Sequence, residues 1–388
     1  MRAPRRLTPA LLLVFSTLSP ALGAEQVRAA AGQTEGASGR DAYARAIGLE
    51  RQGNHSAALA LLWYASGAAP HDADIQNALG EALVRIGALD AAIDAFRHAL
   101  AERAPFQKAA NNLILTLVKA GHGEEAVMRA KALVAEAPRD ADRYFTLGLA
   151  ESEQDVDAAI ATFRRVLELD PAHTLARYNL ALVLKRADRL PEAVETLTRA
   201  IEIEPRPEAF YTLGVIYWQQ GDSDGATRVL RRATAMDPRY ADAYYTLGAV
   251  LAARKDWNGA SDALRRAIAI KPEMPGAHDT LARVLQQSGD AGGGTDEFAE
   301  AQRLRTRAAL EQEAGVWTAV GSRTAESGNL VGALDQFRRA TAVFEGYAPA
   351  HYQIGLVLER LGQHDAARAA FARAAQLNPG LVPPPPSR

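Results

Sequence analysis

Apolar residues recur along most of the chain in paired helical stripes separated by polar breaks. The segment 243–272 reads AYYTLGAVLAARKDWNGASDALRRAIAIKP. Its first stripe, at positions i, i+3, i+4 and i+7 from Tyr244, shares one face of a helix. A second stripe begins at Ala260 and stops at Pro272, which cannot continue a helix. The pattern predicts two helices joined by a turn, and the small residues Gly248 and Ala260 predict a close crossing between them.

This pair of stripes repeats at an almost constant interval. Variants of one pentapeptide start at Tyr144 (YFTLG), Arg177 (RYNLA), Phe210 (FYTLG) and Tyr244 (YYTLG), which are 33, 33 and 34 residues apart. Prolines follow the same interval, at Pro138, Pro171, Pro205, Pro238 and Pro272. A fixed period of this length indicates a solenoid. Each hairpin must stack on its neighbours, because one hairpin alone leaves its apolar stripes in water.

The spacing of Leu-Gly, Ala, Phe or Leu, Ala and Pro within each unit resembles the tetratricopeptide repeat. The pattern can be followed through ten units, most clearly at Leu79-Gly80, Leu213-Gly214, Leu247-Gly248 and Ile354-Gly355. The resemblance implies an all-α fold, a right-handed α-solenoid of about ten antiparallel helix hairpins. It also implies that Leu-Gly is where each hairpin locks onto its neighbour.

The repeats divide the chain into five predicted parts. These are a signal peptide at 1–23, a flexible leader at 24–40, an array of about eight repeats at 41–305, a C-terminal pair of repeats at 306–380 and a proline-rich tail at 381–388. About five residues beyond the family period precede the C-terminal pair, and Gly294 stands where a close-packed Ala is usual. This predicts either a lengthened helix with a change of path near Arg303–Gly315 or ordinary repeat drift.

The first 23 residues have the layout of a secretory signal peptide. A basic start, MRAPRR, precedes an apolar stretch and the small residues Ala21-Leu22-Gly23. We expect cleavage near Gly23/Ala24 and a periplasmic or secreted protein, with 41 basic and 46 acidic residues left. The chain contains no cysteine, which excludes disulfides and thiolate chemistry.

No catalytic, cofactor or metal motif is visible. The eight histidines are scattered, and the sequence contains no HExxH, GxSxG, P-loop or dinucleotide fingerprint. The repeats leave no stretch long enough for a separate catalytic domain. The sequence therefore predicts a protein that is not an enzyme and binds no cofactor or metal. Nucleic acid is not expected as a partner, because the net charge is negative.

In the tetratricopeptide repeat family, first helices line a concave groove, and the residue two before the Leu of Leu-Gly faces a bound partner. Four consecutive units place an aromatic residue there. An aromatic strip that binds a protein or peptide is one interpretation, and packing against the next hairpin is the other. The candidate groove residues are the aromatics Phe145, Tyr178, Tyr211 and Tyr245, with Trp218, Thr212, Thr246 and Asn179 beside them.

Two further features of the sequence do not identify the partner. Lys108, Asn111 and Asn112 resemble part of the set with which some family members grip the acidic C-terminus of chaperones, but the following unit lacks the rest. Arginine pairs such as Arg164-Arg165 form either a basic stripe or, as we favour, a solvated face paired with nearby acids. The leading prediction is a non-enzymatic interaction scaffold. The alternative is an accessory subunit of a cell-envelope enzyme complex, for example one handling polysaccharide.

Overall fold

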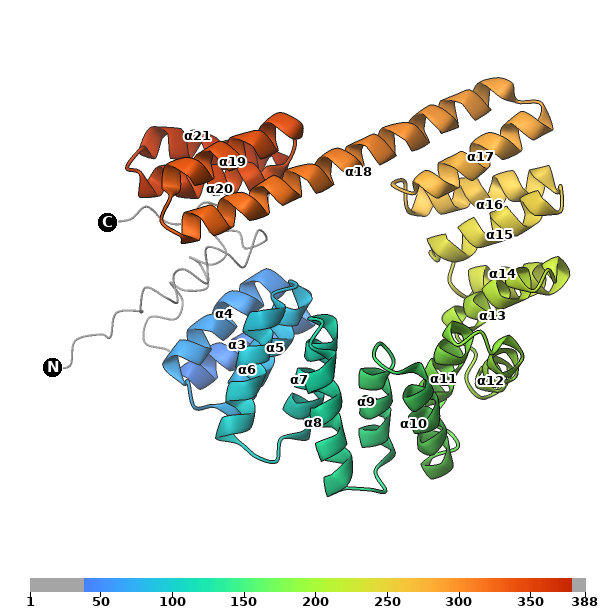
Figure 1. Ribbon diagram of the computed structural model, residues 1–388, viewed down its shortest axis with the longest axis horizontal. Helices are drawn as coiled ribbons and strands as arrows, with labels where there is room; N and C mark the ends of the chain where they lie inside the picture. The colour runs from blue at the N-terminus through green and yellow to red at the C-terminus, as the bar shows by residue number, and fades with distance from the viewer. Residues whose placement is uncertain (1–37, 379–388) are drawn as a thin grey trace. The chain divides into compact units, whose positions relative to one another are not determined.

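The computed structural model describes residues 38–378, and this part of the chain is built from helices without any strand (Figure 1). Consecutive helices pair into hairpins. The helices are α3 (Gly39–Arg51), α4 (His55–Ala68), α5 (Ala73–Arg85), α6 (Leu89–Glu102), α7 (Gln107–Lys119), α8 (Gly123–Glu136), α9 (Ala141–Glu151), α10 (Val156–Leu169), α11 (Thr174–Arg186), α12 (Leu190–Ile203), α13 (Pro207–Gln219), α14 (Ser223–Met236), α15 (Ala241–Ala253), α16 (Trp257–Ile270), α17 (Pro275–Ser288), α18 (Ala291–Glu326), α19 (Leu330–Val343), α20 (Ala348–Arg360) and α21 (His364–Leu377).

Four of the predicted parts fall wholly or partly outside the described residues. The signal peptide at 1–23 and the proline-rich tail at 381–388 lie outside them, as do the leader up to residue 37 and residues 379–380 of the predicted C-terminal pair. The end of the predicted leader belongs to the first helix, because α3 begins at Gly39. Ser38 caps α3 in a reciprocal arrangement with Asp41, in which each side chain bonds the backbone at the other residue.

The turns inside the hairpins share one backbone feature. A residue with positive φ ends the first helix of most hairpins, and it is glycine at seven positions: Gly53, Gly87, Gly121, Gly221, Gly289, Gly328 and Gly362. Asp188 (φ 58°) and Lys255 (φ 61°) hold the same conformation with a side chain. In several turns the next residue caps the second helix, as Asp256 does by accepting a hydrogen bond from the Gly259 amide.

The glycine of each Leu-Gly pair contacts the second helix of its own hairpin. A Cβ on Gly148 would lie 2.7 Å from the ring of Phe163, and one on Gly214 would lie 2.6 Å from Leu230. Leu213, in contrast, belongs to a core cluster with residues of the preceding hairpin such as Leu197. The prediction that Leu-Gly as a whole locks onto the neighbouring hairpin is therefore corrected: the leucine packs between hairpins, and the glycine packs within one.

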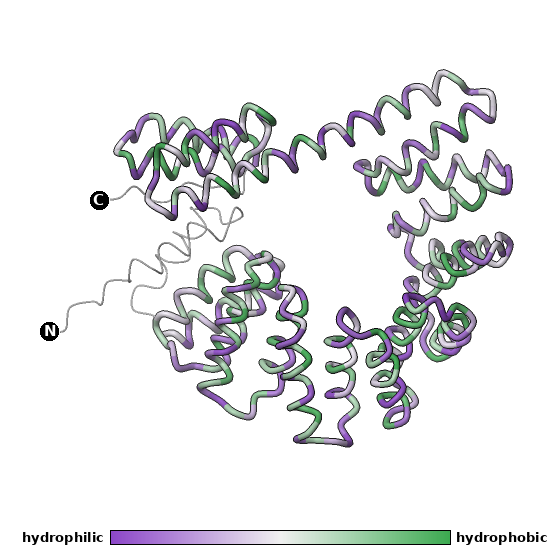
Figure 2. The backbone as a smooth tube through the Cα atoms, viewed as in Figure 1, coloured by the Kyte–Doolittle hydropathy of each residue, from purple (hydrophilic) through white to green (hydrophobic). Residues whose placement is uncertain are grey.

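The described chain forms two compact units. One comprises residues 121–308, and the other comprises 38–120 together with 309–378. Apolar and polar residues are interleaved along the helices in both (Figure 2). In 121–308 the apolar stripes merge into two clusters of buried residues, one spanning α10 to α13 and one spanning α14 to α17. The core is therefore a series of interhelical layers, as expected of stacked repeats.

A single helix of 36 residues, α18, occupies the position of the predicted lengthened helix. Near its start, a Cβ on Gly294 would lie 2.8 Å from the backbone oxygen of Ala282 and 2.7 Å from Gln286 Cγ. The backbones of α17 and α18 are therefore closer here than an alanine would allow. Gly294 is therefore a close-packing position between α17 and α18. A change of superhelical path remains a prediction.

Candidate partner-binding face

The first helices of the hairpins within 121–308 form one face. Helices α11, α13, α15 and α17 contact one another in this order, and each also packs on the second helix of the preceding hairpin. In a stack of hairpins, the side on which like helices approach each other is the inner side of the curve. We call this surface the first-helix face, and its helices α9, α11, α13 and α15 carry the four predicted aromatic residues.

We define the aromatic strip as Phe145, Tyr178, Tyr211 and Tyr245, and all four are half-buried. The Phe145 ring lies 4.8 Å from the imidazole of His173, centroid to centroid. Tyr211 lies 5.1 Å from the ring of Tyr240. His173 and Tyr240 are the N-cap residues of α11 and α15. Each of these two aromatic rings therefore packs on the N-terminus of the next first helix.

The other two members of the strip also reach the next hairpin. The Tyr178 hydroxyl lies 3.4 Å from Thr212 Oγ1 on α13. A Cβ on Gly276, in the first turn of α17, would lie 3.1 Å from Tyr245 Oη. The strip therefore packs between repeats, and each of its four residues keeps part of its surface accessible.

The two threonines predicted to line the groove are buried in the structure. Thr212 and Thr246 are only 5% and 6% exposed. Their hydroxyls donate to the backbone oxygens of Glu208 (2.8 Å) and Asp242 (2.9 Å) in their own helices. The interpretation that they meet a partner is corrected, because burial hides the side chain and the bond within the helix uses its donor.

Asn179 and Trp218 differ from the threonines in exposure. The Asn179 amide donates to the Leu175 carbonyl of its own helix over 2.8 Å, at an exposed position. Trp218 is 39% exposed and is the most open of the predicted aromatic residues. An accessible indole offers both a large apolar surface and an N–H donor.

Negative charge lies beside the strip. Glu208 and Asp242 occupy the first turns of α13 and α15, where the helix dipole favours carboxylates. Both are exposed, and neither makes an ion pair within the described residues. Burial raises the pKa of Tyr240, and the neighbouring phenols and these two carboxylates raise it further. The Tyr240 hydroxyl therefore stays protonated and remains a donor at neutral pH.

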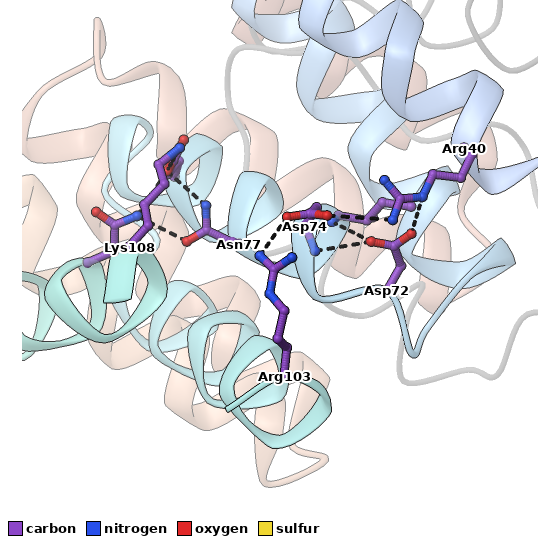
Figure 3. A network of polar contacts seen from close by, with 9 residues as sticks. Arg40, Asp72, Asp74, Asn77, Arg103 and Lys108 are labelled. Carbon is purple, nitrogen blue, oxygen red and sulfur yellow. Dashed lines mark hydrogen bonds and ion pairs between the residues drawn. The ribbon is translucent and has the colours of Figure 1, made fainter. Parts of the chain in front are cut away.

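The other unit carries a charged network on α3, α5 and α7 (Figure 3). Arg40 pairs with Asp72 and, over 3.5 Å, with Asp74. Arg103 donates to the Asp74 carboxylate over 2.7 Å and stacks on the ring of Phe106, 3.6 Å from its centroid. These contacts pair Arg40 and Arg103 with the carboxylates of Asp72 and Asp74.

Glu81 is the centre of the second part of this network. Its carboxylate accepts hydrogen bonds from Asn77 (2.9 Å) and Asn112 (2.9 Å) and pairs with Lys108 (2.7 Å). Burial alone would raise the pKa of Glu81, but the bonds from Lys108, Asn77 and Asn112 together hold it below its ordinary value. Two of the three residues that resembled a chaperone-gripping set, Lys108 and Asn112, are thus bound by a carboxylate of the chain itself, and the third, Asn111, accepts a bond from Gln107.

Two of the four arginine pairs of the second helices, those of α10 and α19, have carboxylate partners. Arg164 donates to Glu192 over 2.7 Å, and Arg165 donates to Glu168 over the same distance. Arg339 pairs with Asp335 over 3.0 Å. The interpretation of these arginines as a solvated, acid-paired face is confirmed at these three positions.

Residues 38–378 offer neither a metal-binding cluster nor a membrane-spanning helix. No group of three or more histidine, aspartate or glutamate side chains in this part of the chain is arranged to hold a metal ion. None of its helices combines the length and the apolar character that a membrane span requires.

Family models of the tetratricopeptide repeat match residues 43–108, 150–214, 211–275 and 348–381, which together are more than half of the chain. A 97-residue stretch is 30% identical to anaphase-promoting complex subunit 3 of Dictyostelium discoideum. The match covers 25% of this chain and 10% of that protein, so the chain spans about a tenth of this relative.

One solved structure shows the same fold, and a second is similar over part of the chain. A tetratricopeptide repeat protein from Parabacteroides merdae ATCC 43184 superposes with a TM-score of 0.51 at 19% identity, covering 64% of this chain and 100% of that one. A crystal structure of MamA covers 42% of this chain and 96% of its own at 26% identity, with a TM-score of 0.41.

Proposed function

Because this chain belongs to the tetratricopeptide repeat family, we propose that it is a non-enzymatic scaffold that holds a protein or peptide segment against the first-helix face of residues 121–308. The observation that supports this most is the aromatic strip, which continues through four successive hairpins and stays half-exposed while packing between them. Trp218 adds a more accessible indole on α13.

The packing of the strip lowers the cost of binding. Each ring is already held by the next hairpin, so the ring itself loses little side-chain entropy when a partner contacts its exposed part. Tyrosine and tryptophan supply large contact areas with few rotatable bonds, and both are common at interaction hot spots. The strip is a preformed surface.

The charge beside the strip favours a basic partner. The unpaired carboxylates of Glu208 and Asp242 attract lysine and arginine side chains. A cationic side chain can also lie over a tyrosine or tryptophan ring. The partner that fits best is an extended segment with basic residues between apolar ones.

Peptide arrays test this proposal. The chain from residue 24 onward is incubated with extended peptides of varied charge, and the best binders are measured by calorimetry. We expect Trp218→Ala to weaken binding at least tenfold, as hot-spot aromatics do. Phe298→Ala is the matched control, because Phe298 is another large, exposed side chain (56%) away from the strip. Equal affinities for both variants would exclude the exposed surface of α13 around Trp218 as part of the site.

The second candidate function is an accessory subunit of a cell-envelope enzyme complex that handles polysaccharide. The exposed Trp218 indole supports it, because a flat aromatic face can stack on a sugar ring. Oligosaccharide arrays distinguish the two: binding of a glycan that Trp218→Ala abolishes, without peptide binding, favours the second.

We also propose that the protein acts in the periplasm or outside the cell. The signal-like residues 1–23 support this. N-terminal sequencing of the exported protein tests it, and we expect a start near Ala24. A chain that retains Met1 in the cytoplasm would contradict the proposal.

A further inference from the structure

A small cleft opens between α10, α11 and α12 in residues 121–308. Its volume is about 120 Å³, and it includes no member of the aromatic strip. Three arginines reach it, one from each of the three helices. The lining residues are Arg164, Arg177, Leu180, Leu184, Glu192, Glu195, Thr196 and Arg199.

The two carboxylates that line the cleft do not neutralise all of the arginines that line it. Glu192 is shared, since it accepts from Arg164 (2.7 Å) and also from Arg189 (2.6 and 2.8 Å). Glu195 accepts from Arg199 over 2.8 Å. The cleft is thus lined by three arginines and two carboxylates. One of these carboxylates, Glu192, also binds a fourth arginine, Arg189.

Arg177 is the arginine without a carboxylate. Its Nη2 donates to the backbone oxygen of Pro171 over 2.6 Å, and it makes no ion pair in the part of the chain that the structure describes. Its Nε is buried and has no hydrogen-bond partner. The Arg177 guanidinium therefore brings to the cleft a positive charge that no carboxylate of the described residues pairs with, and this charge can attract an anion.

We propose that this cleft binds a tetrahedral oxyanion, a phosphate or sulfate group. Guanidinium groups from three helices present several N–H donors, and the fork of Arg suits phosphate oxygens. The Thr196 hydroxyl adds a donor at the rim. A planar carboxylate is a poorer fit, because it offers two oxygens and Glu192 and Glu195 already supply that group.

The cleft is large enough to hold only the anionic group of a ligand. Pockets for drug-sized ligands and cofactors measure about 300–1,000 Å³, whereas this one measures about 120 Å³. The group can be free in solution or carried by the headgroup of an anionic lipid. Both sources present the same oxygens to the arginines, so experiment must distinguish them.

Calorimetry on the chain from residue 24 onward tests the site. Sodium phosphate and sodium sulfate are titrated at constant ionic strength against a chloride background, since exposed charges are screened by salt. We expect binding in the millimolar range or tighter. Arg177→Gln should weaken it at least tenfold, the effect expected when one charged hydrogen-bond donor is lost.

Two further variants keep the result interpretable. Arg199→Gln alters a mostly exposed side chain (62%), so it should weaken binding without lowering the melting temperature measured in chloride. Arg232→Gln removes an exposed arginine of α14 outside the cleft and should bind like the wild type. If neither anion binds, or if Arg177→Gln and Arg199→Gln both bind like the wild type, the proposal is wrong.

Sedimentation with vesicles distinguishes the sources. Phosphatidylglycerol vesicles are compared with phosphatidylcholine vesicles, which have no net charge. Binding to phosphatidylglycerol that inorganic phosphate displaces and Arg177→Gln abolishes identifies a lipid headgroup as the source. Binding of inorganic phosphate without vesicle binding identifies a free oxyanion.

Discussion

The backbone of Gly80 lies directly against the ring of Phe96. A Cβ at position 80 would come within 2.5 Å of the ring, which is fully buried. The same relationship joins Gly321 to Phe337 and Gly355 to Phe371. A large side chain of each second helix therefore occupies the space that the first helix leaves by having no side chain at this position.

Replacing this glycine by alanine should destabilise the protein. Alanine is favoured over glycine in a helix interior by about 1 kcal/mol, but Gly80→Ala forces the buried Phe96 ring to move. Overpacking of this kind costs about 1–3 kcal/mol. We expect a net fall in the free energy of unfolding, measured by urea denaturation.

Gly48→Ala is the matched control, because Gly48 lies inside α3 and a Cβ there would meet nothing within 4 Å. It should stabilise the protein by about 0.5–1 kcal/mol. If both variants shift stability in the same direction, close packing does not explain the Leu-Gly glycine.

Gly294→Ala should be more damaging than its helical position suggests. The added Cβ would lie 2.8 Å from the Ala282 carbonyl, and a backbone atom cannot yield as a side-chain end can. We expect a loss of at least about 2 kcal/mol. Gly292→Ala is the comparison, because its Cβ would approach no atom closer than 4.0 Å. Equal stability of the two variants would restore the interpretation of repeat drift.

Glu81 and Glu151 should respond in opposite directions to the same substitution. Hydrogen bonds hold the pKa of Glu81 below 4.5 although burial opposes them, whereas burial raises the pKa of Glu151 against a bond from Thr162. Glu81→Gln should lower the free energy of unfolding at pH 7 by about 1–3 kcal/mol. Glu151→Gln should raise it by about 1 kcal/mol, because no charge is then buried.

The pH dependence follows from the direction of each shift. The contribution of Glu81 is complete above its unfolded pKa and is lost as pH falls through the lowered folded value, so the deficit of Glu81→Gln should shrink in acid. The ionisation of Glu151 costs stability as pH rises through its raised folded pKa, so the gain of Glu151→Gln should also vanish in acid. Denaturation curves at pH 7 and about pH 3 measure both, and a pH-independent difference would contradict the assignment.

Thr246→Val should leave partner binding unchanged. The hydroxyl is buried and bonds to its own helix, so valine loses one backbone contact and keeps the shape. We expect a change in stability of less than about 1.5 kcal/mol and an affinity for the best array peptide equal to that of the wild type. A clear loss of affinity would return Thr246 to the binding surface.

The repeat period and the local chemistry of each hairpin could be predicted from the sequence. Pro272 correctly predicted the end of the second helix, which is α16. The resemblance to the tetratricopeptide repeat implied an all-α fold, which the helices of residues 38–378 and the matches to the family confirm. These features depend on residues close together in the chain, where helical periodicity and allowed backbone angles act directly.

Only the tertiary structure decided what each residue faces. The stacking of hairpins brings together side chains about 30 positions apart, as Tyr211 meets Tyr240 and Lys108 meets Glu81. No local pattern states whether Thr246 is buried or whether Arg177 lacks an acceptor, because both depend on how the neighbouring helices pack. The sequence determined the repeating unit, and the packing between helices determined which of its side chains remain available for a partner.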